Sequence, residues 1–154
     1  MRKHMGFTLV ELVVVVMILG ILAAVAAPKL LGTSSVATDN GLKQTLAVVR
    51  DAIERYAAEN GGALPGELGT EADFKADLQP FLRGAFPICP VAEKDSSVKI
   101  TTNGNTDLEL ETVTAGHSWH YNNGNGTFGG QFICNSAEKT RSDDDDANLQ
   151  YNQL

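Results

Sequence analysis

One long apolar run near the start of the chain limits the possible folds more than any other feature. The segment from Phe7 to Ala27 is 21 residues long and carries a single formal charge, on Glu11. A helix of that length spans about 32 Å, which matches the hydrocarbon core of a bilayer at about 30 Å. We therefore expect a membrane-spanning helix here, and the rest of the 154-residue chain suffices for one folded domain.

Three interpretations of this run differ in the role they give to Glu11. A secretory signal peptide would be shorter, and Pro28 would directly follow the best cleavage point. A plain membrane anchor leaves the carboxylate as an insertion cost of about 2.5–3.5 kcal/mol. If the chain is instead cut between Gly6 and Phe7, the new amine of one chain neutralises Glu11 of a neighbour and sets the stagger between them. The third interpretation is the one that gives Glu11 a function, which is to specify assembly.

The N-terminal sequence, MRKHMG followed by FTLVELVVVVMILGILAAVAAP, resembles the leader and helix of type IV pilins and type II secretion pseudopilins. The matching features are a short basic leader, Gly6, Phe7, Thr8, Leu9, Glu11 and Pro28. The resemblance implies that a membrane-embedded prepilin peptidase removes residues 1–6 by cutting after Gly6 and N-methylates Phe7. It also implies storage in the membrane and polymerisation into a helical filament, with Phe7 and Glu11 directing assembly.

The same resemblance defines the expected surroundings of the chain. It implies a single-pass protein of the bacterial inner membrane, whose residues 29–154 are exported to the periplasm or the cell exterior. The implied partners are other copies of the chain, the prepilin peptidase, an inner-membrane assembly platform, and minor pilins or pseudopilins. Nucleic acid is not expected as a partner, because the formal net charge is −7 and no basic stripe alternates with aromatic residues.

The two cysteines are expected to lie in the exported part of the chain. Arg2 and Lys3 precede the apolar run, and short basic flanks tend to stay in the cytoplasm. Cys89 and Cys134 then lie in a compartment where disulfides form, and we predict that they pair. The alternative is two buried free thiols. The spacing is not C-x-x-C, so it gives no support to a redox or zinc site.

Beyond Pro28 the pattern predicts an amphipathic helix that continues to about residue 60. Its apolar face is formed by Leu42, Leu46, Val49, Ile53 and Tyr56, at spacings of three and four residues. Helix-ending residues follow, namely Gly61, Gly62 and Pro65. The resemblance implies the same architecture, an α+β pilin fold. In it, a long N-terminal helix with a membrane-spanning half at residues 7–28 packs on a small antiparallel sheet.

The second half of the chain predicts a connecting loop, a short helix and a sheet. Thr70 is placed to cap the short helix, Phe74 and Leu78 share one of its faces, and Pro80 ends it. Turn residues then separate four candidate strands, Val98–Thr102, Leu108–Val113, His117–Asn122 and Thr127–Cys134. We expect three or four of them to form an antiparallel sheet against the helix, followed by an acidic tail.

Few residues of the chain point to chemistry. His117 and His120 alternate along a predicted strand, so their side chains diverge, and we interpret both as surface residues beside the packing residues Trp119 and Tyr121. Four acidic residues at Asp143–Asp146 are a possible calcium site, since related major pseudopilins bind calcium near that end; the alternative is a solvated acidic tail. No cofactor is otherwise expected. We find no catalytic constellation and predict no enzyme.

These observations favour a structural subunit of a type II secretion pseudopilus, the filament that drives protein export. The loop with LPG and FPICPV, and the W-x-Y-N strand with its glycine-rich turn, resemble the major pseudopilin G type. One alternative is a type IV pilus subunit for adhesion, motility or DNA uptake. A second is a monomeric secreted binding domain with an ordinary signal peptide.

Overall fold

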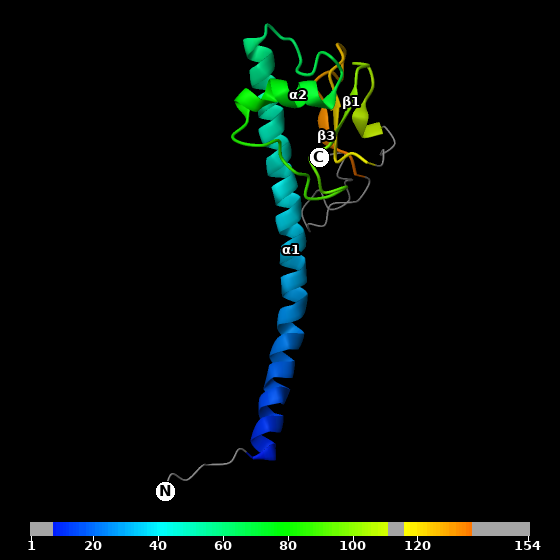
Figure 1. The fold of residues 1–154 in the computed structure, drawn as a ribbon. Coiled ribbons are helices and arrows are strands. Elements are labelled where there is room, and N and C mark those ends of the chain that lie inside the picture. Colours follow the sequence, from blue (N-terminus) through cyan, green and yellow to red (C-terminus); the bar gives the residue numbers. More distant parts are fainter. Residues whose placement is uncertain (1–7, 111–115, 137–154) are drawn as a thin grey trace. The chain divides into compact units, whose positions relative to one another are not determined.

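The computed structural model describes residues 8–110 and 116–136 (Figure 1). Its elements are α1 (Leu9–Glu59), α2 (Glu71–Leu78), the 3-10 turn η1 (Gln79–Phe81), β1 (Val98–Thr101), the 3-10 turn η2 (Leu108–Leu110), β2 (Trp119–Asn122) and β3 (Phe132–Cys134). The chain divides into two compact units, Met1–Ser35 and Val36–Leu154, and α1 contributes residues to both. The expected α+β class is confirmed.

The described part of the first unit is the beginning of α1. Every side chain from Thr8 to Ala27 is exposed, although nearly all of them are apolar. By length and composition, Leu9–Ala27 is a helix that can cross a membrane. The helical hydrogen-bonded conformation continues through Gly20 and Pro28 without a break.

In the second unit, the rest of α1 has the predicted apolar face. Leu42, Leu46 and Val49 are fully buried or nearly so. The helix ends at Glu59, and Gly61 follows with a φ of +67°, the left-handed conformation that glycine adopts without steric cost. The next amide, that of Gly62, donates to the Ala57 carbonyl at 2.7 Å. The predicted helix end is therefore confirmed.

Helix α2 also begins and packs as the sequence predicts. The side-chain oxygen of Thr70 accepts a hydrogen bond from the Asp73 amide at 3.2 Å and caps the first turn. Phe74 and Leu78 are fully buried on one face. Pro80 lies in η1, the 3-10 turn that follows the helix directly.

The sheet has the strand order β1-β2-β3 and mixed directions. β2 and β3 are antiparallel, with Trp119 opposite Cys134, whereas β1 and β2 are parallel, with Val98 opposite Trp119. The prediction of an antiparallel sheet is therefore wrong for the first pair. Parallel neighbours require a crossover connection in place of a hairpin, and the segment between β1 and β2 provides it.

The same connection contains the segment Leu108–Val113, which was predicted to be a strand. That prediction is wrong for the residues that the structure describes. Leu108–Leu110 forms the 3-10 turn η2, and residues 111–113 lie outside the described part. The Leu108 side chain is buried, and its amide donates to the side-chain oxygen of Gln131 at 2.8 Å. Because a side chain satisfies this backbone donor, the segment needs no strand partner there.

One hydrophobic core joins the second part of α1, helix α2 and one face of the sheet. An aromatic group forms its centre: the Phe74 ring stacks on Tyr121 at 4.2 Å between centroids, and Trp119 stacks on Phe132 at 5.3 Å. Arg50 on α1 adds a polar link, since its Nε and Nη2 donate to the Phe132 carbonyl at 3.0 and 2.8 Å. The second unit thus forms its hydrophobic core from its own residues.

Two loops, residues 102–106 after β1 and the glycine-rich residues 123–130 after β2, lie in backbone contact. A Cβ at Gly124 would lie 2.1 Å from the Gly104 amide nitrogen and 2.3 Å from the Thr102 carbonyl oxygen. The Phe128 amide donates to the Gly104 carbonyl at 2.9 Å. Only glycine fits at such an approach, and the contact fixes the two loops together.

Candidate functional site

The candidate site lies at the beginning of α1, where Thr8 and Glu11 form a reciprocal pair. The Thr8 amide and hydroxyl both donate to Glu11 Oε2, at 2.9 and 2.7 Å. In return, the Glu11 amide donates to the Thr8 hydroxyl oxygen at 3.2 Å. This arrangement is a capping box, which satisfies donors that the first turn of a helix leaves without partners.

The capping box changes the interpretation of the Glu11 carboxylate. Within a single chain the carboxylate already accepts two hydrogen bonds, which offset part of its desolvation cost but do not neutralise its charge. Sequence reasoning missed this role, although Thr8-Leu-Val-Glu11 matches the Ser/Thr-x-x-Glu pattern of a capping box. Gly6 and Phe7, the predicted cleavage and methylation residues, lie outside the described part, so their roles stay predictions.

The apolar surface that follows Glu11 has no cover within the described chain. Leu12, Met17 and Leu22, which point in different directions around the helix, are 58%, 65% and 60% exposed. A helix that is apolar all round is stable only among lipids or other apolar helices. The arrangement can therefore combine an apolar contact surface with a carboxylate held at its N-terminal end.

The two cysteines lie side by side, as their predicted pairing requires. Both are fully buried, with the two Sγ atoms 3.5 Å apart. The Cys89 amide also donates to the Asp95 carbonyl at 2.9 Å, which closes residues 89–95 of the connecting loop into a turn. The structure brings the two residues together from 45 positions apart in the sequence. The covalent bond stays a prediction.

The two histidines do not share a site. His117 precedes β2, whereas His120 lies within it, is 2% exposed and has a ring nitrogen 2.8 Å from the Thr101 hydroxyl. The interpretation of His120 as a surface residue is wrong, because β2 is the central strand and both of its faces are covered. Trp119 and Tyr121 are buried packing residues, as predicted.

A metal site receives no support from the described residues, where no three side chains of His, Cys, Asp or Glu lie close enough to hold an ion. The calcium prediction concerns Asp143–Asp146, which lie outside the described part of the chain. Calcium binding there therefore stays a prediction.

Comparison with known proteins relates parts of the chain to a family motif and to named relatives. Residues 1–27 match the family model of the prokaryotic N-terminal methylation motif. The type II secretion system core protein G of Vibrio cholerae is 39% identical over 72 residues, which cover 47% of this chain and 49% of that protein. Core protein G of Klebsiella pneumoniae is 33% identical over 72 residues (47% and 51%), and that of Pseudomonas aeruginosa 35% over 71 residues (46% and 50%).

These similarities have a defined extent. The chain spans about half the length of the curated relatives it matches. No solved structure matches the chain. The fold, the motif and the named relatives agree with one another, and they confirm the resemblance drawn from the N-terminal sequence. The chain is a pilin-like α+β protein that carries the prokaryotic N-terminal methylation motif and, over about half its length, resembles the pseudopilins of type II secretion.

Proposed function

We propose that the chain is a structural subunit of a type II secretion pseudopilus. In this proposal it is made as a precursor, cleaved between Gly6 and Phe7, methylated at Phe7 and polymerised through the first part of α1. The methylation motif at residues 1–27 and the relatives named core protein G support the proposal. The subunit supplies packing and stagger to the filament and no catalytic step.

The observation that carries the proposal is the geometry of Glu11. Both donors of Thr8 end on the same carboxylate oxygen, Oε2, so that Oε1 can accept from the amine of another chain. The capping box also holds the carboxylate at the helix terminus, next to where cleavage would create the Phe7 amine. In the low dielectric of a helix bundle, an ammonium–carboxylate pair is far stronger than in water. One register between neighbours satisfies it, and the other registers leave both charges unpaired.

The proposed location follows from the apolar surface of Leu9–Ala27. Before assembly, lipid would cover this surface, with Arg2 and Lys3 on the cytoplasmic side of the inner membrane and the second unit in the periplasm. On assembly, the same helices of neighbouring copies would replace the lipid. The proposed partners are therefore other copies, the prepilin peptidase, the inner-membrane assembly platform and minor pseudopilins.

N-terminal sequencing and intact-mass measurement of the protein from its native cell envelope test the proposal directly. The expected chain begins with N-methylated Phe7, and electron microscopy of sheared envelope fractions is expected to show filaments that contain it. A chain that begins at or near Pro28 would contradict the proposal, because the apolar run would then have served only as a signal peptide.

A further inference from the structure

In the second unit, several asparagines are followed directly by glycine, the sequence in which the next backbone nitrogen most easily attacks a side-chain amide. They are Asn40, Asn60, Asn103, Asn123 and Asn125. Glycine has no side chain to shield its nitrogen, and its backbone adopts conformations that other residues avoid. The attack also requires that the asparagine side chain can rotate over its own backbone and that water can reach it. The structure describes all of these sites and shows which of them meets both conditions.

Helix α1 holds the first two sites in unreactive conformations. Asn40 and Gly41 lie within the helix, where the backbone hydrogen-bond pattern fixes both residues. Asn60 directly follows the helix, and its Nδ2 donates to the Tyr56 carbonyl at 2.8 Å, which turns the side chain back toward the last turn. Attack by the Gly61 nitrogen therefore requires that this hydrogen bond breaks first.

The side chains of Asn103 and Asn123 are held by the folded loops. Asn103 Oδ1 accepts a hydrogen bond from the Asn105 amide at 3.1 Å, so its side-chain carbonyl is directed past Gly104 to the next residue. Asn123 donates through Nδ2 to the Gly66 carbonyl, and its Oδ1 is buried, out of reach of water. Both sites can react only after the loop opens locally.

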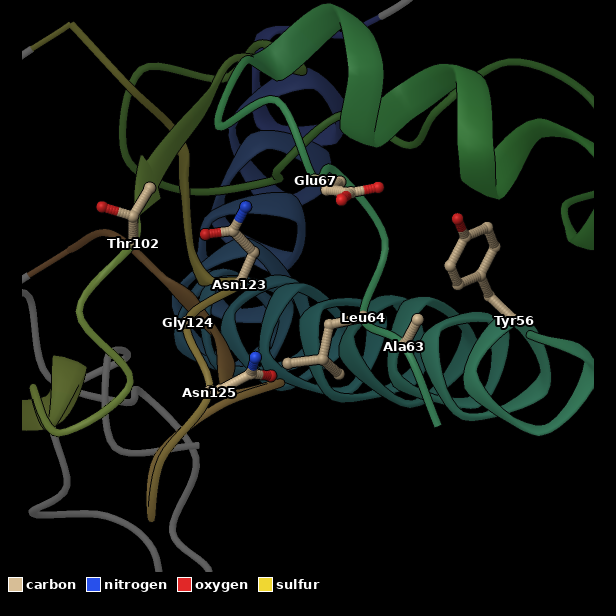
Figure 2. A pocket seen from close by; sticks show the side chains of 8 residues that line it. All are labelled: Tyr56, Ala63, Leu64, Glu67, Thr102, Asn123, Gly124 and Asn125. Atoms are coloured by element: carbon tan, nitrogen blue, oxygen red, sulfur yellow. The ribbon is translucent and has the colours of Figure 1, made fainter. Parts of the chain in front are cut away.

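Asn125 differs from the other four sites in both respects. Figure 2 shows it after Asn123 and Gly124 on the loop that follows β2, where its side chain lines a surface pocket. Asn125 and Gly126 are both exposed, and the Asn125 side chain forms no hydrogen bond within the described part of the chain. The side chain can therefore rotate until its Cγ meets the Gly126 nitrogen, in contact with water.

We propose that the Asn125–Gly126 bond is a site of spontaneous deamidation and isoaspartate formation. The Gly126 nitrogen loses its proton to water and attacks Asn125 Cγ; a carbon–nitrogen bond forms, the Cγ–Nδ2 bond breaks, and ammonia leaves. Water then opens the resulting succinimide ring at one carbonyl to give aspartate, or at the other to give isoaspartate. Water is the only co-reactant, and no electron is transferred. This modification is independent of filament assembly, so each proposal can fail without the other.

The isoaspartate product affects a backbone contact that has no spare room. A Cβ at Gly104 would lie 2.4 Å from the Asn125 carbonyl carbon and 2.5 Å from the Gly126 nitrogen, so the two loops touch at the reacting bond. Isoaspartate adds one methylene group to the backbone at this bond. The hydrogen bond from the Phe128 amide to the Gly104 carbonyl belongs to the same contact. Isoaspartate therefore separates residues 102–106 from residues 123–130, whereas the aspartate product leaves the backbone unchanged.

Peptide mapping by mass spectrometry tests the proposal on the full-length chain, incubated in detergent micelles at mildly alkaline pH. The rate at each Asn-Gly site is divided by the rate at the same site in urea-unfolded protein, which removes differences that come from sequence alone. We expect the folded structure to slow the other four sites at least about fivefold more than Asn125, the factor that one hydrogen bond supplies. A second site that is slowed as little as Asn125 would overturn the proposal.

Two variants at the same position separate the reaction from its effect on the loops. Asn125→Gln lengthens the side chain, which disfavours ring closure, so most of the ammonia released by the folded protein should be lost. Asn125→Asp supplies the charge of the products with an unchanged backbone. The isoaspartate form, purified after incubation, should unfold at lower denaturant concentration than Asn125→Asp. Ammonia release from Asn125→Gln at the wild-type rate would overturn the assigned site, and equal unfolding midpoints would overturn the separation of the loops.

Discussion

The two units of the chain differ in what covers their apolar residues. In the second unit, Leu42, Phe74 and Trp119 are completely buried by residues of the same unit. In the first, Leu9 is 77% exposed and Leu19 58% exposed, and among its described residues the Thr8 and Glu11 side chains form hydrogen bonds with each other. A surface of this size and apolarity is not stable in water. The second unit therefore forms its core from residues of the same chain, whereas the apolar surface of the first unit must be covered by lipid or by other chains.

Glu11→Ala is the substitution expected to have the largest effect. It should abolish filament assembly and leave the second unit unaffected. The variant removes the carboxylate that would pair with a neighbouring amine, so we expect no filaments by electron microscopy. Thermal unfolding of the second unit is expected to be unchanged, because Glu11 lies outside it. Val14→Ala, an exposed change on the same helix, serves as the control. Filaments of Glu11→Ala at the wild-type level would show that charge pairing does not direct assembly.

Core truncation is the next largest effect, and it should be confined to the second unit. Phe74→Ala removes a fully buried ring that stacks on Tyr121, and it should lower the free energy of unfolding by about 3–5 kcal/mol. Leu19→Ala removes a similar apolar group from an exposed position and should leave that free energy unchanged. Denaturant titration in detergent, followed by the fluorescence of Trp119, measures both. A similar loss in both variants would mean that the units do not unfold separately.

Oxidation of the two cysteines should stabilise the second unit further. A bond between Cys89 and Cys134 would close a loop of 46 residues, and the chain-entropy model gives about 4 kcal/mol for a loop of that length. We expect the oxidised protein to unfold at higher denaturant concentration than the protein in reductant, and a Cys89→Ser variant to show no such dependence. Mass spectrometry after alkylation counts the free thiols. Two alkylated thiols in protein from the periplasm would contradict the predicted pairing.

The helices of both units could be predicted from sequence because their signals are local. Thr70 caps α2, Gly61 follows the end of α1, and the spacing of Phe74 and Leu78 gives the buried face. The direction of β1 could not be predicted from sequence. The segment LELETV, between β1 and β2, alternates like a strand, and this pattern favoured antiparallel neighbours joined by hairpins. Contacts distant in sequence, such as that of the Leu108 amide with Gln131, instead favour a 3-10 turn.

The candidate sites show the same limit of local signals. The Thr8–Glu11 capping box can be recognised in the sequence as a four-residue pattern. It was missed because Glu11 was considered only as a charge within a membrane. The choice of Asn125 among the Asn-Gly sites could not be made from sequence, because only contacts of the folded chain distinguish these sites. Burial of His120 had no sequence signal either, since it depends on β2 being the central strand.

The smallest expected effect concerns the acid sensitivity of the second unit. Asp95 Oδ1 accepts a hydrogen bond from the Ser97 amide at 2.9 Å, and bonds from the Ser97 and Ser118 side chains help to lower the pKa of Asp95. A lowered pKa in the folded state means that this carboxylate stabilises the fold above its unfolded pKa of about 3.9, and that the contribution is lost as pH falls through the folded value.

Asp95→Asn tests this contribution, which for an exposed carboxylate is at most about 1 kcal/mol. The variant should be slightly less stable than wild type at pH 7, and the difference should be smaller at pH 2, because the stabilisation by the Asp95 carboxylate is lost as the pH falls through its folded-state pKa. Denaturant titrations at both pH values measure it, and Glu93→Gln, on the same loop, controls for the loss of one negative charge. A difference that is undiminished at pH 2 would mean that Asp95 acts through the shape of the turn, independently of its charge. The second unit would then owe its acid sensitivity to other carboxylates, while the first unit, whose one carboxylate side chain is that of Glu11, would show its own through assembly alone.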